Sequence, residues 1–144
     1  MVVNERTGEQ VEFVVDTPEL LQMDVTWPEP GHRAPRHVHP GMEERWTVLR
    51  GRAAFEIDGV IVDAQEGTTV VAPAGRPHVA WNPSDGPVHL RIEMRPALRW
   101  AEFVRRLFAG EDPGPLIAEF GDEIVLAPIT SPLRRESAQR HPLS

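Results

Sequence analysis

The strongest constraint on the fold is a regular series of short apolar stretches between residues 11 and 94, each ended by turn-forming residues. In Leu20–Trp27 and again in Val88–Met94, apolar and polar residues alternate, which is typical of a β-strand with one buried face. Asp58-Gly59 joins two such stretches and predicts a type I′ hairpin, because both central positions of that turn need a positive φ. The pattern predicts an all-β fold, an antiparallel sandwich or barrel.

The same signals predict nine strands. They are Val11–Asp16, Leu20–Trp27, Arg36–His39, Glu44–Arg50, Ala53–Ile57, Val60–Val62, Thr68–Ala72, Pro77–Trp81 and Val88–Met94. Fifteen prolines and 11 glycines in 144 residues also suit many short strands better than long helices. One domain is the default for a chain of this length.

The periodicity changes after Pro96. Apolar residues from Trp100 to Phe108 fall at helical spacing, and Gly110 is a candidate residue for ending a helix, so Leu98–Ala109 is predicted to form one amphipathic helix. It would cover a barrel edge or join a dimer contact. We therefore divide the chain into residues 1–110, a β-domain with its following helix, and residues 111–144, a C-terminal extension. Leu116–Phe120 and Ile124–Ile129 are short apolar pieces in this extension, and Arg134–Ser144 is expected to be an irregular, frayed end.

Composition excludes several classes of function. The net charge is −7, and the basic residues are dispersed, so neither nucleic acid nor an anionic membrane surface is an expected partner. The absence of cysteine excludes disulfides, thiolate metal sites and cysteine nucleophiles. No signal peptide is visible, and a cytoplasmic location is expected.

Three histidines and a glutamate indicate a metal site. His37 and His39 are two residues apart in a predicted strand and therefore point to the same face. Glu44 begins the next strand, and His78 begins a strand far along the chain. If these strands are neighbours, the imidazoles and the carboxylate converge on one point. Such a mixed set suits one divalent transition metal ion, among Fe, Mn, Ni, Co, Cu and Zn, better than Ca or Mg.

The glycines and prolines around these residues complete two motifs. The first, Gly–(X)5–His–X–His–(X)4–Glu–(X)6–Gly, is formed by Gly31, His37, His39, Glu44 and Gly51, and the second, Gly–(X)5–Pro–X–Gly–(X)2–His–(X)3–Asn, by Gly67, Pro73, Gly75, His78 and Asn82. The two motifs are separated by 15 residues. On these positions, the chain resembles the cupin superfamily, as a small single-domain member, over about residues 11–95.

The resemblance implies a cupin-type jelly-roll β-barrel and the metal ligands His37, His39, Glu44 and His78. Glu43 competes for the carboxylate role, but adjacent strand residues face opposite ways, so only one of the two points inward. The six-residue gap to Gly51 favours Glu44. Glu43 is then expected on the outer face near Arg45.

Other residues of interest have weaker signals. Trp46 shares a face with Glu44 and is a candidate for lining a substrate cavity, although barrel filling explains it equally well. Met42 is a candidate for the cavity mouth. His32, His89 and His141 are not expected to be ligands.

Two functions remain open at this stage. The first is a metal-dependent enzyme, an oxidoreductase of dioxygenase type or a cyclase or isomerase, acting on a small aromatic or enolic molecule, with Glu44 also able to serve as a base. The second is a non-catalytic cupin that binds a metal or a small molecule. The resemblance also implies a homodimer, with Val11–Val15, the helix around Phe103–Phe108 and Ile124–Ile129 as candidate contacts.

Overall fold

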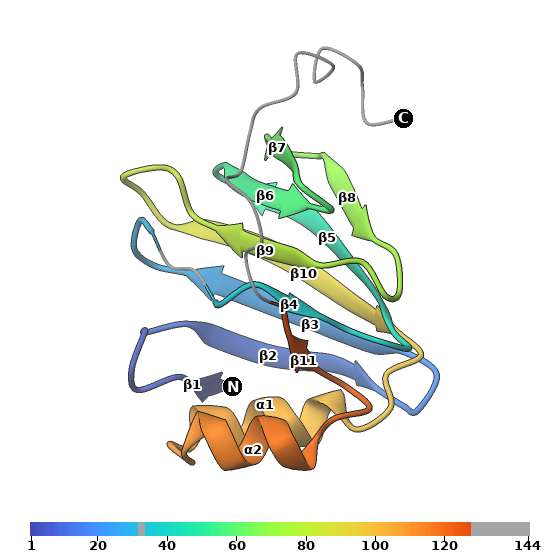
Figure 1. Cartoon of the computed structure of the whole chain (residues 1–144). Helices are drawn as coiled ribbons and strands as arrows, with labels where there is room; N and C mark the ends of the chain where they lie inside the picture. The colour runs from blue at the N-terminus through green and yellow to red at the C-terminus, as the bar shows by residue number, and fades with distance from the viewer. Residues whose placement is uncertain (32–33, 128–144) are drawn as a thin grey trace.

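The computed structural model describes residues 1–31 and 34–127. Its elements are β1 (Val2–Val3), β2 (Gln10–Asp16), β3 (Leu21–Trp27), β4 (His37–Val38), β5 (Glu43–Arg50), β6 (Ala53–Ile57), β7 (Val60–Ala64), β8 (Thr69–Ala72), β9 (His78–Trp81), β10 (Val88–Arg95), α1 (Trp100–Phe108), α2 (Pro113–Glu119) and β11 (Val125–Leu126). All nine predicted strands are present, with bounds shifted by at most two residues. The all-β prediction is confirmed, and Figure 1 shows the strands in two layers.

The first layer is a six-stranded antiparallel sheet in the order β1-β2-β3-β10-β5-β8. Its central strands bury alternate residues, as the sequence predicts: β3 and β10 each place every second side chain in the core. Across these strands Val25 pairs with Leu90, and Met23 with Ile92. This sheet therefore turns one continuous apolar face towards the second layer.

The second layer is a five-stranded sheet in the order β11-β4-β9-β6-β7. Asp58 and Gly59 join β6 to β7 with φ of 53° and 87°, which confirms the predicted hairpin. The register that matters for the site is between β4 and β9, where His37 lies directly opposite His78. The topology thus brings two residues that are 41 positions apart in the sequence side by side.

The core lies between the two sheets, which stay separate rather than closing into one continuous barrel. Figure 1 shows α1 and α2 along the edge of this sandwich where β1 and β2 lie. Helix α1 is the predicted helix, and Gly110, with φ of 98°, follows its C-cap as expected. Its apolar residues Phe103, Val104 and Phe108 are buried within the chain, so α1 covers the sandwich edge.

The C-terminal extension, predicted to hold short apolar pieces in a partly extended chain with a frayed end, also contains a helix that was not predicted. Pro113–Glu119 is a helix, begun by Asp112, whose carboxylate accepts a hydrogen bond from the Gly114 backbone at 3.1 Å. Residues 125–126 then form β11, which pairs with β4. Residues 111–127 are therefore packed onto the preceding domain, whereas the predicted frayed end Arg134–Ser144 and the last residues of Ile124–Ile129 lie outside the described residues. Among the described residues, neither helix has the length and apolar character that a membrane span requires.

Candidate metal centre

The structure brings His37, His39, Glu44 and His78 into one group. Each offers one potential ligand atom, and the four atoms lie within 4.8 Å of one another. His37 comes from β4, His39 follows it, His78 begins β9, and Glu44 comes from β5 in the other sheet. The group therefore spans the interior between the two layers, and three of its four side chains are buried.

The three imidazole rings are oriented by backbone carbonyls. Nδ1 of His37 donates to Pro35 O at 2.7 Å, Nδ1 of His39 to Glu123 O at 2.8 Å, and Nδ1 of His78 to Arg76 O at 3.2 Å. A carbonyl oxygen only accepts hydrogen bonds, so each Nδ1 carries the proton. Each ring consequently turns Nε2 towards the other members of the group, which is the arrangement of metal-binding histidines with outer hydrogen-bond partners.

Electrostatics favour a neutral imidazole beside an ionised carboxylate. Burial lowers the pKa of His37 to about 4, and the neighbouring His78 and His39 contribute to this lowering, so the ring is uncharged at neutral pH. Burial by itself would raise the pKa of Glu44, but hydrogen bonds from His39 and His78 outweigh it and hold the pKa well below its usual value. Glu44 is therefore an anion in the protein interior.

A cation fits this donor set. Nε2 of His39 and Nε2 of His78 lie 2.9 and 3.1 Å from the same oxygen of Glu44, Oε1. Since both rings already carry a proton on Nδ1, each contact requires either a second proton on the ring or a cation shared by the nitrogen and the oxygen. Ligands about 2.1 Å from one ion lie up to about 4.2 Å apart, so the observed group is close to binding separation.

The neighbouring glutamate points away from the group. Glu43 is half-buried on the other face of β5, where its Oε1 accepts a hydrogen bond from Arg45 at 3.2 Å. Glu44, by contrast, is 8% exposed and turns inward. The alternation of β5 thus places the two carboxylates as the sequence predicts.

Backbone contacts join the two sequence motifs around His39. The Gly75 N–H donates to His39 O at 2.9 Å, and Gly75 has a φ of 80°, a left-handed conformation that glycine adopts without strain. Asn82, fully buried, donates through Nδ2 to Gly86 O at 2.8 Å, while its own backbone carbonyl accepts from Gly31 at 2.7 Å. Asn82 and the motif glycines therefore shape the loops that carry the histidines.

A cavity of about 390 Å³ opens onto the group. His37, Glu44 and His78 form one part of its wall, and the rest is largely apolar side chains from both sheets and from α1. Trp46 lies in this wall with its ring 5.3 Å from that of His78. Met42 is fully buried in the core and is not among the described residues that line the cavity, because its side chain packs inside the sandwich instead of at the mouth.

Sequence reasoning missed three residues next to the group. Trp100 of α1 packs edge-on against His39, with ring centroids 4.7 Å apart. Glu123 supplies the carbonyl that holds His39, and Asn4 lines the cavity from the N-terminal segment. Helical periodicity marks Trp100 only as part of an amphipathic helix, and no periodicity or motif marks Glu123 or Asn4. The roles of all three depend on how the two chain ends pack. His89 hydrogen-bonds Thr26 away from the group, and His32 and His141 lie outside the described residues.

Comparisons with known proteins decide the family. Residues 27–94, which hold all four residues of the group, match the family described as a cupin domain. These residues form a cupin domain. The predicted jelly-roll fold is thereby confirmed, and β1, β2, α1, α2 and β11 of this cupin lie outside the matched residues. No curated protein sequence matches this cupin.

Solved structures share the fold. TT1209 from Thermus thermophilus is 25% identical, with a TM-score of 0.57 over 61% of this cupin and 83% of that chain. The DMSP lyase DddQ from Ruegeria pomeroyi DSS-3 is 26% identical, with a TM-score of 0.52 over 60% of this cupin and 46% of that chain. The cupin domain of Schizosaccharomyces pombe Cnp3, 15% identical, has a TM-score of 0.57 over 74% of each chain.

Proposed function

We propose that this cupin binds one divalent transition metal ion through His37, His39, Glu44 and His78 and acts as a metal-dependent enzyme on a small organic molecule. One observation carries the proposal: the ligand group forms part of the wall of an internal cavity instead of being enclosed by protein. A purely structural metal site needs no such space, whereas a catalytic one keeps a position open for substrate.

The cavity suits a molecule with an apolar body and one oxygen-bearing end. About 390 Å³ is within the range of small-molecule sites. Trp46, Trp100 and Phe103 give the part of the wall near the ligand group a flat, aromatic character. An aromatic or enolic substrate, with its oxygens towards the metal and its ring against these side chains, is the best match.

Different residues of the chain would orient the metal ligands, exclude water and take a proton. When bound, the ion would act as a Lewis acid on an oxygen-bearing group of the substrate. The backbone carbonyls of Pro35, Arg76 and Glu123 keep the three imidazoles in the tautomer that presents Nε2. The aromatic side chains exclude water from the bound molecule. Glu44, whose carboxylate faces the cavity, is the residue placed to take a proton from the substrate.

The reaction belongs to the dioxygenase or cyclase type in our proposal. The similarity to a DMSP lyase supports enzymatic chemistry on a small molecule in this fold, but this cupin covers 46% of that chain, and its activity is not transferred. Among the described residues, Arg6 is the only lysine or arginine on the cavity wall. The lack of a basic cluster there argues against a highly anionic substrate.

The test has two stages. The purified protein is loaded separately with Fe²⁺, Mn²⁺, Ni²⁺ and Zn²⁺, and its metal content is measured by mass spectrometry; one equivalent per chain is expected. Each loaded form is then incubated with phenols, β-diketones and aromatic hydroxy acids while oxygen consumption and product masses are followed. Turnover with one class supports the enzyme. Binding without turnover identifies a non-catalytic cupin, and failure to bind any metal overturns the proposal.

We also propose that this cupin is a cytoplasmic homodimer, with the outer face of β2 in the contact. Val14 on that face is 49% exposed, whereas Phe103, Val104 and Phe108 of α1 are buried within the chain and are not available. Light scattering in solution would give about twice the 16.1 kDa chain mass for a dimer. A Val14→Asp variant that remains dimeric would exclude this contact.

A further inference from the structure

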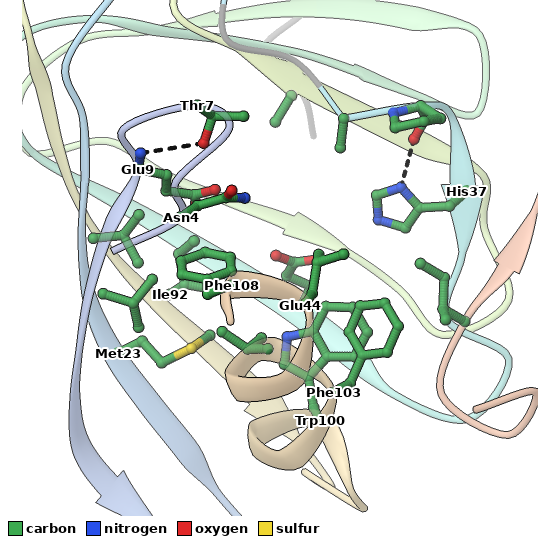
Figure 2. A pocket seen from close by; sticks show the side chains of 18 of the residues that line it. Asn4, Thr7, Glu9, Met23, His37, Glu44, Ile92, Trp100, Phe103 and Phe108 are labelled. Carbon is green, nitrogen blue, oxygen red and sulfur yellow. Dashed lines mark hydrogen bonds between the residues drawn. The ribbon is translucent and has the colours of Figure 1, made fainter. Parts of the chain in front are cut away.

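The cavity has a second polar end that lies outside the cupin match. Figure 2 shows His37 at one side of the cavity and Asn4, Thr7 and Glu9 at the opposite side. These three residues belong to the turn between β1 and β2, which precedes residues 27–94. The ligand group thus lies within the family match, whereas the far end is built by a segment outside it.

Asn4 presents an unpartnered donor to this cavity. The side chain is 7% exposed and lines the cavity. Its Oδ1 accepts a hydrogen bond from the Arg6 backbone N–H at 3.0 Å, which fixes the orientation of the amide, since only the oxygen can accept. Nδ2 is left with two N–H donors and, across the described residues 1–31 and 34–127, no hydrogen-bond partner.

The turn that carries Asn4 is rigidly held. The Asn4 backbone N–H donates to Glu9 O at 2.8 Å, and Gly8 donates back to Asn4 O at 2.8 Å. Arg6 donates to Gly110 O at 3.2 Å, which ties the turn to the end of α1. Trp27 donates to Glu9 Oε2 at 3.0 Å and ties it to β3. The Asn4 amide is therefore preorganised and cannot turn to solvent to find a partner without disrupting this turn.

The charges at this end favour a neutral acceptor. Arg6 and Glu9 both line the cavity there and carry opposite charges, so the formal sum is zero. A second carboxylate on a ligand would lie near Glu9 as well as Arg6 and would gain little from their opposite charges, whereas a carbonyl, ether or hydroxyl oxygen can accept from the Nδ2 donors without a charge. Burying a donor without a partner is costly, so a bound molecule that satisfies Nδ2 gains over one that does not.

We propose that Asn4 is a specificity-determining residue for an elongated ligand. This ligand carries a metal-binding acidic or enolic oxygen at one end, an apolar and preferably aromatic body, and a neutral hydrogen-bond acceptor at the other end. The body lies along the apolar wall between Glu44 and the N-terminal turn, and the far oxygen accepts from Asn4 Nδ2. This inference rests on the proposed function, because the first end needs the metal.

The probes are paired phenylalkanoic acids of increasing alkanoate length, each made with a para-acetyl and with a para-isopropyl group. The two groups are nearly equal in shape, but only acetyl accepts a hydrogen bond. Calorimetry on the Zn²⁺-loaded protein should show the acetyl member binding about threefold to tenfold more tightly at the length that spans the cavity, the value of one net hydrogen bond.

The decisive variant is Asn4→Asp. It keeps the oxygen that Arg6 needs and replaces the two N–H donors by an acceptor, so the turn is retained and the acetyl preference should disappear or reverse. Gln65→Glu makes the same amide-to-carboxylate change at an exposed turn away from the cavity and should leave the preference unchanged. Thermal unfolding of each variant shows whether the fold is intact, and Asn4→Ala, which should also lose the preference, replaces Asn4→Asp if that variant fails to fold.

Two results would overturn the assignment: equal affinity of acetyl and isopropyl compounds for the wild type at every length, or the same acetyl preference in Asn4→Asp as in the wild type. Zn²⁺ content, measured on the same samples, separates this failure from that of the metal proposal. A protein that holds Zn²⁺ but ignores the acetyl group contradicts the role of Asn4 alone, whereas a wild type that holds none of the four ions contradicts both.

Discussion

His37 and His78 face each other across β4 and β9, and each offers Nε2 because a backbone carbonyl holds its Nδ1. Replacement of either histidine by alanine removes one of four donors and leaves three, so we expect metal affinity to fall by more than about 100-fold. Metal titration followed by mass spectrometry measures this loss. Equal metal content in the wild type and both variants would contradict the ligand assignment.

The adjacent glutamates offer a matched pair. Glu44→Gln removes the negative charge that Oε1 presents to two histidines, and we expect metal affinity to fall by about tenfold or more. Glu43→Gln removes a charge on the outer face, where Glu43 accepts a hydrogen bond from Arg45, and should leave metal content unchanged. A larger effect at Glu43 than at Glu44 would reverse the choice between them.

Two motif glycines should differ in how strongly they resist substitution. Gly51 has a φ of 88°, and an added Cβ would lie 2.7 Å from Pro87 O, whereas Gly67 has a φ of 85° with open space around the same position. Gly67→Ala should cost about 1–2 kcal/mol of unfolding free energy from backbone strain alone. Gly51→Ala should cost more, because the backbone must also move. Urea denaturation of both variants gives the comparison, and equal losses would mean that the contact with Pro87 relaxes freely.

Strand alternation is the main reason why the sequence could predict which way single side chains of β5 point. It puts Glu44 and Trp46 on one face and Glu43 on the other, because the side-chain period of a strand is two, and the six-residue gap from Glu44 to Gly51 then selects the inward face. Asn4 could not be found in this way. Its significance comes from one hydrogen bond to Arg6 and from contact between the N-terminal turn and α1, neither of which leaves a periodic signal.

Among the elements, the strands and α1 follow from local patterns, but α2 is missing from the prediction despite a local signal. Asp112 followed by Pro113 is a favourable helix start, with a capping carboxylate and a proline in the first turn. The helix is only seven residues long and has one buried residue, Leu116, so its hydrophobic pattern is too short to show a period. The two-residue strands β1 and β11 exist only through their pairing partners.

The segment that follows α2 should support the metal centre from outside the family match. Phe120 is fully buried against Phe103, and its carbonyl accepts the Glu123 N–H at 2.9 Å, in the turn whose Glu123 O holds His39. We expect Phe120→Ala to lower the unfolding free energy by about 3–5 kcal/mol. It should also weaken metal binding by about tenfold, because His39 loses its anchor.

Chemical denaturation and metal titration of Phe120→Ala test these two effects separately. Val125→Ala is the control, because Val125 lies in the same segment, is 46% exposed and should change stability by less than about 0.5 kcal/mol. A folded Phe120→Ala protein with unchanged metal affinity would show that the C-terminal segment stabilises the fold without positioning His39.

At the scale of the whole molecule, the cavity is the feature that sequence could least predict. The two sequence motifs predict the ligand group, since they include the glycines and the proline that form the turns next to the ligands. The space beside the group depends on three segments that meet only in the folded chain: the N-terminal turn, α1, and the residues from Pro113 to Leu126. All three lie outside residues 27–94, so the family match covers the ligand group but not these parts of the cavity wall.

The proposed metal would also join the two layers. Glu44 belongs to the six-stranded sheet, and His37 and His78 belong to the five-stranded sheet, so a shared ion links sheets that are not continuous with each other. Without it, the buried Glu44 carboxylate is left, within the described part of the chain, with its contacts with His39 and His78. Because the folded state alone assembles the four ligands, metal binding should stabilise it by mass action.

We therefore expect metal removal to lower the melting temperature. At a free metal concentration about 100 times the Kd, binding contributes about 2.7 kcal/mol, which corresponds to roughly 5–10 °C for a chain of this size. Scanning calorimetry of the loaded protein, with and without a chelator, measures the difference. His78→Ala, which lacks one ligand, should melt at nearly the same temperature in both conditions. A wild type whose melting temperature ignores the chelator would show that the four residues hold the sheets together without an ion.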